Sequence, residues 1–199
     1  MSKHLFMAAL TLAFLFTTQS QAQSLKDLFN KENVEKAVST LTGENTANME
    51  GTWIFTGSAV EFESDNLLQK AGGTVAATAL EQKLNEQLER IGIKNGQLSF
   101  TFNADSTFQT TLGKKDSAGT YSYDSSTKEV ALKFTRLLNL KAKLNCTSAQ
   151  MGLLFNADKL LNLITMLTSK SNNATLQAIN SLTENYDGMR LGLALEKKQ

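Results

Sequence analysis

Apolar and polar residues alternate through the middle of the chain, from Gln97 to Phe134. In three short runs, 98–102, 121–123 and 130–134, every second residue is apolar, and in a fourth, 108–112, the apolar residues Phe108 and Leu112 share a face. Successive side chains of a strand point to opposite faces of its sheet, so each run predicts a strand with one buried face. Short polar residues separate the runs at 103–106 and 124–127, where such side chains hydrogen-bond their own backbone in turns. The pattern predicts an antiparallel meander.

Further alternating stretches extend this meander at both ends. The first covers residues 49–63, and its alternation changes phase at Gly57-Ser58, which indicates a β-bulge. Three more strands are predicted after the meander, at 138–147, 151–155 and 189–196. Eight strands with one apolar face each favour a closed up-and-down barrel, because closure hides that face and removes the exposed edges. The alternative is a twisted sheet wrapped around a long helix.

Apolar residues at helical spacing predict helices before, between and after these strands. The helical stretches are 24–41, 75–91, 158–169 and a segment capped by Asn172-Asn173. The first of them could form a lid or an arm against the barrel exterior, and we favour the arm. The chain is therefore predicted to be mainly β: an eight-stranded antiparallel barrel with an N-terminal helix and with helical insertions after strand 1 and before the last strand.

The first residues have the pattern of a secretory signal. Lys3 precedes the apolar run 5–16, and small residues stand at Ser20 and Ala22. The run is shorter than the roughly 20 apolar residues that a spanning helix needs. No cysteine lies near the cleavage site, which argues against a lipid anchor. We predict a signal peptide at 1–22, a helix and linker at 23–48 and the barrel at 49–199, in an exported, periplasmic or secreted protein without a stable membrane anchor.

Composition narrows the chemistry of the predicted mature chain. The whole chain has 20 basic and 19 acidic side chains, and the signal carries one basic and no acidic residue. Nucleic acid is not an expected partner, because its binding needs a basic surplus. The only histidine, His4, lies in the signal, and the only cysteine is Cys146 on an apolar strand face. Usual zinc sites, Ser-His-Asp triads and Cys-His pairs need histidine or several cysteines. We therefore predict no catalytic residues, no metal site, no cofactor and no enzyme.

Charged residues in the strand region give no competing site. Gly113-Lys114-Lys115-Asp116 lacks the spacing of a phosphate-binding loop and is predicted to be a hairpin loop. Glu61 and Glu63 flank an apolar residue of the first strand and are predicted to face water.

The remaining candidate site is the barrel interior. An eight-stranded barrel is filled by side chains or holds one small ligand. The candidate ligand-binding residues are Trp53, Phe100, Phe102, Phe108, Tyr121, Tyr123, Phe134 and Arg136. Thr110, in phase with them, is a further polar contact. Such a lining suits a small apolar, lipid-like ligand. The alternatives are a solid barrel that acts as a protein-interaction module through its helices at 157–184, its partner undefined, and an enzyme with converging buried carboxylates.

Gly51-Thr52-Trp53 on the first strand resembles the opening motif of the lipocalins. Together with residues 100–108 and Gly119-Thr120-Tyr121, the chain is similar to an uncharacterised family of lipocalin-like proteins exported by Bacteroidetes. The resemblance implies a lipocalin or calycin-like barrel and binding of an apolar ligand. It also implies that Trp53 closes the barrel floor beneath a late arginine, here Arg190, whose strand phase faces outward. The helical insert after the first strand resembles the lid of intracellular fatty-acid carriers.

Overall fold

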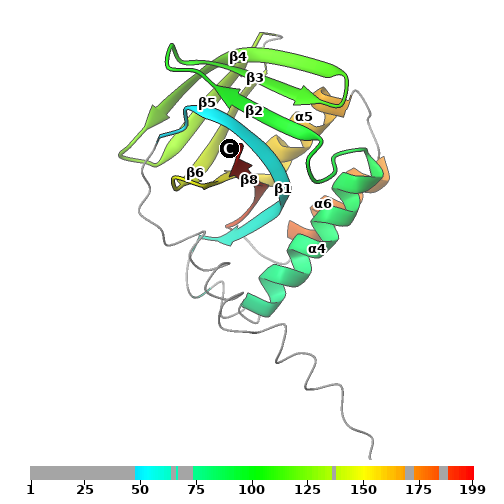
Figure 1. Cartoon of the computed structure of the whole chain (residues 1–199). Helices are drawn as coiled ribbons and strands as arrows, with labels where there is room; N and C mark the ends of the chain where they lie inside the picture. The colour runs from blue at the N-terminus through cyan, green and yellow to red at the C-terminus, as the bar shows by residue number, and fades with distance from the viewer. Residues whose placement is uncertain (1–47, 64–65, 67–73, 136–137, 169–172, 184–187) are drawn as a thin grey trace, which may run out of the picture. The chain divides into compact units, whose positions relative to one another are not determined.

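All strands of the described residues form one closed antiparallel barrel. The computed structural model describes residues 48–63, 66, 74–135, 138–168, 173–183 and 188–199, all within one compact unit at 38–199 (Figure 1). The strands are β1 (Gly51–Phe62), β2 (Leu98–Phe102), β3 (Thr107–Leu112), β4 (Lys115–Asp124), β5 (Glu129–Phe134), β6 (Asn139–Cys146), β7 (Gln150–Phe155) and β8 (Met189–Lys197). Each strand pairs with its neighbour in sequence, and β8 pairs with β1. The predicted up-and-down barrel is confirmed.

Three helices accompany the barrel, and they are α4 (Thr74–Arg90), α5 (Ala157–Thr168) and α6 (Asn173–Thr183). They confirm the predicted helical insertions after strand 1 and before the last strand. α4 and α6 lie side by side, and α5 packs against β6, β7 and β8 (Figure 1). The predicted signal peptide, the helix at 24–41 and the candidate residue Arg136 lie outside the described residues.

β1 bends at a bulge and changes neighbours along its length. The register with β8 shifts between Phe55 and Gly57, so Thr56 is the extra residue. The predicted bulge is thus present, one residue before the expected position. β1 pairs with β2 only from Gly51 to Ile54, whereas it follows β8 as far as Phe62. Beyond Ile54, the backbone N–H groups on the edge of β1 that faces β2 need hydrogen-bond partners other than β2.

Helix α4 supplies these partners with side chains in place of a strand. The Ser58 N–H donates to Asn85 Oδ1 at 2.6 Å, and the Val60 N–H donates to Glu81 Oε1 at 3.2 Å. The Ser58 hydroxyl donates to the Glu81 carbonyl at 2.7 Å. Satisfied backbone donors are what a buried strand edge requires, so α4 closes the gap between β1 and β2. Its apolar face joins the core through Leu80, Leu84 and Leu88.

The Glu81 carboxylate gives this closure a dependence on pH. Burial raises the pKa of Glu81, and the bond from the Val60 N–H lowers it in part. Since the folded state then binds a proton more readily than the unfolded state, the free energy of unfolding should fall as pH rises through the folded pKa. Glu81→Gln keeps an acceptor for Val60 without the charge. We therefore expect its stability relative to the wild type to increase from about pH 4 to about pH 7.

Urea unfolding at the two pH values measures this difference. Glu86→Gln, on the same helix, is the matched control for removing one acidic charge from α4. A Glu81→Gln variant whose stability relative to wild type is the same at both pH values would contradict the assignment.

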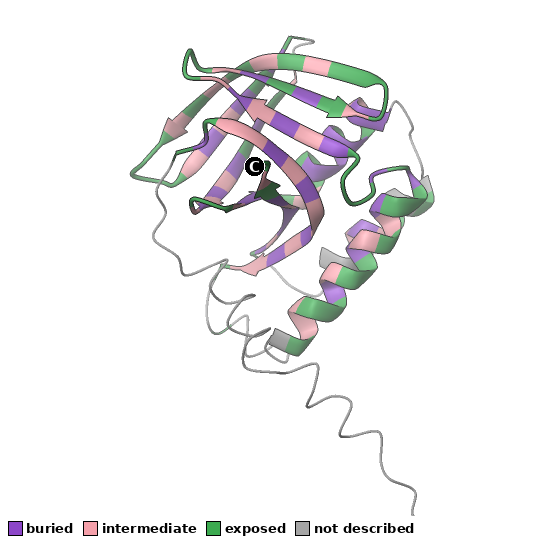
Figure 2. Ribbon diagram, viewed as in Figure 1, coloured by how far each residue is buried: buried purple, intermediate pink, exposed green. Residues whose placement is uncertain are grey.

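The core occupies the inside of the barrel and the contact with the helices. Buried and partly buried residues alternate along β1 and β2 (Figure 2). β7 departs from alternation, because Leu154 is as fully buried as its neighbours Leu153 and Phe155. α5 adds five buried apolar side chains to the core, at Leu160, Leu161, Leu163, Ile164 and Leu167.

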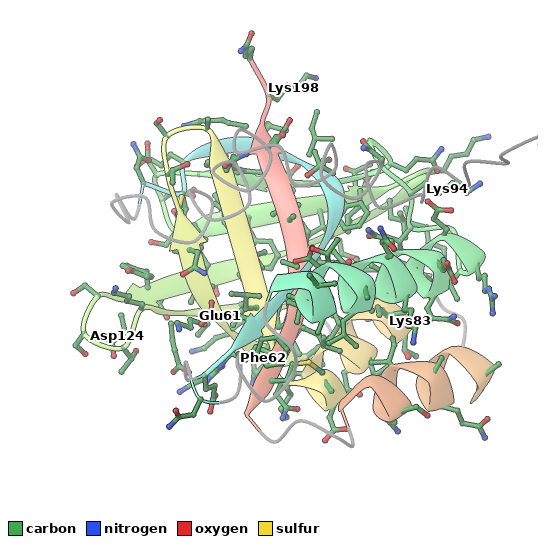
Figure 3. The ribbon with its side chains drawn as sticks, turned by 90° about the horizontal axis from the view of Figure 1, so that it is seen from below. Glu61, Phe62, Lys83, Lys94, Asp124 and Lys198 are labelled. Atoms are coloured by element: carbon green, nitrogen blue, oxygen red, sulfur yellow. The ribbon has the colours of Figure 1, made fainter. Side chains whose placement is uncertain are left out.

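Two predictions about charged segments are wrong in detail. The Glu61 side chain, labelled in Figure 3, is only 14% exposed, pairs with Lys143 on β6 and accepts a bond from Asn145 Nδ2 at 2.9 Å. Strand coiling brings β1 near β6, which no local pattern reveals. The predicted loop 113–116 is a turn of two residues, since Lys115 and Asp116 already pair with β3. The polar start of β4 concealed that strand from the apolar pattern.

Candidate functional site

The predicted ligand-binding residues of the described chain form one cluster inside the barrel. Phe102 lies against Tyr121 with ring centroids 5.1 Å apart at 80°, and Phe108 meets Phe134 at 4.9 Å and 89°. Phe100 stacks on Phe102 at 6.1 Å. Edge-to-face pairs at these distances stabilise the cluster beyond the burial of their area. Sequence periodicity therefore identified residues that do lie together.

Side chains fill the deep interior of the barrel. Trp53, Phe100 and Phe108 each have 0% of their surface accessible, and so do Leu132 and Leu144. A cavity large enough for water would leave its lining accessible to a water-sized sphere, and these side chains offer no such surface. A ligand at this depth would have to displace side chains.

The two tyrosines of β4 were expected to offer polar contacts inside the barrel, but they lie at its edge. The Tyr121 hydroxyl donates to the Asn103 carbonyl at 2.9 Å, in the turn between β2 and β3. Burial, followed by the negative charges of Glu50 and Asp105, raises the pKa of Tyr121. Tyr123 lines a surface pocket of about 340 Å³ on β4, β5 and β6. Both tyrosines are partly buried and pack against the outside of the aromatic cluster.

Trp53 is held at its end of the barrel by a hydrogen bond and a cation. Its Nε1 donates to the Met49 carbonyl at 2.7 Å, and Lys197 Nζ lies 5.2 Å from the ring centroid. The expectation that Arg190 covers this ring is wrong, because Arg190 bonds Glu63 with an Nη2–Oε1 distance of 3.0 Å. Lys197 faces Trp53 in the register of β8 with β1, and a cation over indole is favourable there.

Thr110 places an unsatisfied hydroxyl in the apolar interior. It is 1% exposed and pairs in register with Phe100 on one side and Ser117 on the other. Among the described residues, its Oγ1 is a buried side-chain oxygen without a hydrogen-bond partner. Leaving such a group unsatisfied costs about 1–3 kcal/mol. This polar group in an apolar barrel calls for a partner.

A pocket opens at the end of β3, where its lining begins at Leu112, two residues beyond Thr110, and near the last residues of α4 and α5. We call it the rim pocket; its volume is about 280 Å³, and it is lined by Ile91, Gly92, Gln97, Leu112, Gly113, Lys114, Lys115, Leu167 and Thr168. Leu112, which lines the pocket, lies on the same face of β3 as Thr110, because the two residues are two positions apart in the strand. Lys115 Nζ donates to the Thr168 carbonyl at 2.9 Å and so ties the end of α5 to β4.

Sequence reasoning missed the rim pocket because its walls come from distant segments. The adjacent lysines in a turn between strands were the only local signal. That Ile91 and Leu167 stand beside them follows from the closure of the barrel and the return of α5, which no periodicity encodes.

Cys146 belongs to the core, as its strand phase predicted. It is 2% exposed, and burial raises the pKa of its thiol to about 11, with Lys197 opposing the rise. Because the thiolate is the reactive form, we expect a disulfide reagent such as dithiodipyridine to modify the folded protein about a hundredfold more slowly than the urea-unfolded protein at about pH 8. Rates within a factor of about three of each other would contradict a buried, protonated thiol.

Within the described part of the chain, no three His, Cys, Asp or Glu side chains are grouped so that they could hold a metal ion. None of the described helices combines the length and apolarity needed to cross a membrane.

The protein family that matches the chain agrees with the barrel. The family described as Lipocalin-like domain (DUF4923) matches residues 25–197. Among solved structures, a DUF4847 family protein from Bacteroides vulgatus ATCC 8482 is similar at 14% identity, over 75% of this chain and 95% of that chain, with a TM-score of 0.35. No curated protein matches the chain.

Proposed function

This chain belongs to the lipocalin-like domain family, and on that premise we propose that it binds a small apolar ligand at the helix-covered end of its barrel. The observation that carries the proposal is the Thr110 hydroxyl, buried without a partner two residues before Leu112, which lines the rim pocket. A polar group of a ligand that enters from the rim would satisfy this hydroxyl. The apolar body of the ligand would contact Ile91, Leu112 and Leu167.

The site differs from a preformed hollow barrel. Its volume of about 280 Å³ is near the lower end of ordinary ligand pockets. Leu112 is only half-buried, so it can move aside at less cost than the sealed residues below. The deep aromatic cluster then acts as a rigid floor, and binding takes place in the layer of Leu112 and Thr110.

Thr110→Val separates the two roles of the hydroxyl. Valine has nearly the same shape, so we expect the free energy of unfolding to rise by about 1 kcal/mol as the unsatisfied group is removed. Binding of 1-decanol, measured by displacement of the neutral fluorophore N-phenyl-1-naphthylamine, should weaken about fivefold because one hydrogen bond is lost. Thr111→Val, on the opposite face of β3, is the matched control and should leave decanol binding unchanged.

The filled interior favours a second candidate function, a protein-interaction module with a solid barrel. On that hypothesis the wild type binds neither the fluorophore nor decanol. Native mass spectrometry would then give the mass of the free chain after incubation with either compound, and the ligand proposal would fail.

A further inference from the structure

We propose that Asn95 is a site of covalent self-modification, at which deamidation releases the turn before β2 from strand β1. Asn95-Gly96 is the only Asn-Gly pair in the sequence. In such a pair the backbone nitrogen of the glycine attacks the side-chain carbonyl carbon of the asparagine, because no side chain on the glycine obstructs the approach. The reaction takes water as its co-reactant and needs neither a ligand nor an enzyme.

The modification has two steps, and its atoms and charges balance. In the first step the Gly96 nitrogen loses its proton to hydroxide and bonds to Asn95 Cγ. The Cγ–Nδ2 bond breaks, and ammonia leaves after taking a proton from water, so that a succinimide ring remains. In the second step water adds to one of the two ring carbonyls and breaks its bond to nitrogen. One water has entered, one ammonia has left, and position 95 carries a carboxylate in an aspartyl or isoaspartyl link.

The turn that contains Asn95 is open to solvent. The Gln97 N–H donates to the Lys94 carbonyl at 3.0 Å, so residues 94–97 form a four-residue turn, and all four are exposed. Gly96 has a φ of 77°, and a Cβ added there would meet no atom within 4 Å. Water and hydroxide therefore reach both reacting groups.

Two hydrogen bonds hold the reacting groups against β1. The Gly96 N–H donates to the Phe55 carbonyl at 2.9 Å, and Asn95 Nδ2 donates to the Thr56 carbonyl at 3.2 Å. Phe55 and Thr56 lie at the bulge, just beyond the last pair that β1 forms with β2. The turn thus begins the closure of the barrel that α4 continues at Ser58.

The same two bonds control the reaction. The Gly96 nitrogen cannot attack while its N–H is donated to Phe55, so the turn must first leave β1. Exposed turns open locally at a lower cost than the core of a protein. We therefore expect the folded chain to deamidate at Asn95 about ten- to a hundredfold more slowly than the urea-unfolded chain.

The product no longer fits the position that Asn95 occupies. A carboxylate oxygen replaces the Nδ2 donor, and a carboxylate only accepts hydrogen bonds, so it faces the Thr56 carbonyl as a second acceptor. An isoaspartyl link also lengthens the backbone of the turn and disturbs the bond from Gln97 to Lys94. Deamidation should therefore keep the turn away from β1 and loosen the closure at the bulge.

Peptide-map mass spectrometry of the protein aged in mildly alkaline buffer, folded or unfolded in urea, tests the site and its control by the turn. We expect the small mass gain of an amide replaced by an acid at Asn95, with the difference in rate given above. Asn139, exposed on β6 and followed by Leu140, is the internal control and should remain unmodified over the same period. Asn95→Gln keeps an amide but cannot form the five-membered ring, so this variant should not gain the mass at position 95.

Asn95→Asp reproduces one product and tests its effect on the barrel. We expect its melting temperature to fall by about 2–4 °C, for the loss of one hydrogen bond in a protein of this size. Asn139→Asp makes the same change of charge at another exposed asparagine and should shift the melting temperature by about 1 °C or less.

Each part of the proposal can fail separately. If Asn95 were modified no faster than Asn139 in the unfolded chain, the assignment of the site would be wrong. Equal rates at Asn95 in the folded and unfolded chains would show that the bonds to Phe55 and Thr56 do not control the reaction. An unchanged melting temperature of Asn95→Asp would show that the product does not release the turn. Either of these last two results would overturn the coupling of the modification to β1.

Discussion

Replacing Trp53 with alanine should lower the free energy of unfolding by about 3–5 kcal/mol, the usual cost of truncating a fully buried tryptophan. Trp53 has 0% exposure and lies between β2 and β8, opposite Phe100 and Lys197. The substitution also removes the donor to the Met49 carbonyl and the ring beneath the Lys197 ammonium. The void left at the floor cannot be filled by neighbours that are themselves closely packed. Urea titration followed by circular dichroism measures the change.

Two matched variants divide this cost between packing and polar contacts. Trp53→Phe keeps an aromatic ring and loses the 2.7 Å bond to Met49, so we expect about 1–2 kcal/mol. Lys197→Met keeps an apolar stem over the ring and removes the cation, for an expected loss of about 0.5–1 kcal/mol. A Trp53→Ala variant that unfolds within about 1 kcal/mol of the wild type would show that the floor is not packed as the structure has it.

The order of strands β2 to β7 could be predicted because each has one buried face and a short connection to the next strand. Phe100, Phe102 and Phe108 alternate with polar residues, and the turns between strands contain their own hydrogen-bonding side chains. These are local signals, and antiparallel neighbours joined by short turns need little more. The position of Trp53 in the core followed from the same alternation.

Contacts between strands distant in sequence could not be predicted in this way. Glu61 was expected in water because alternation places it opposite the core, yet the coiling of β1 brings it to Lys143. Lys197 was overlooked because the apolar pattern of β8 ends at Leu195, although the register continues to Trp53. Alternation reports which side of a sheet a residue occupies, and it says nothing about which residues lie across from it.

The candidate site could be predicted only in part, because alternation identifies the face of a strand but not the residues across from it. The interior cluster could be derived from strand phase, and Thr110 was in phase with it. Whether that interior is hollow depends on how side chains from all strands interlock, which the volumes along one strand do not determine. The rim pocket arises where Lys114 of the β3–β4 turn and Lys115 at the start of β4 meet the ends of two helices, and helix direction is set by packing.

Gly119→Ala should be among the most disruptive small substitutions in the barrel, with a loss of about 3 kcal/mol or more. A Cβ at this position would lie 2.1 Å from the Lys133 carbonyl oxygen and 2.9 Å from the Phe108 ring. The first is backbone of the neighbouring strand β5, so relief requires the strands to separate. Gly119 pairs with Phe108 on one side and Phe134 on the other, and its missing side chain leaves room for their edge-to-face contact.

Gly152→Ala is the matched control, a buried glycine in the middle of another strand. The nearest atom to its added Cβ would be Asn145 Cβ at 3.7 Å, an ordinary contact distance. We expect its free energy of unfolding to stay within about 1 kcal/mol of the wild type, since alanine loses less backbone entropy than glycine on folding. Thermal unfolding of the two variants side by side measures the difference. Equal stability would mean that β4 and β5 can separate at Gly119 at little cost, and that the aromatic cluster does not depend on their close approach.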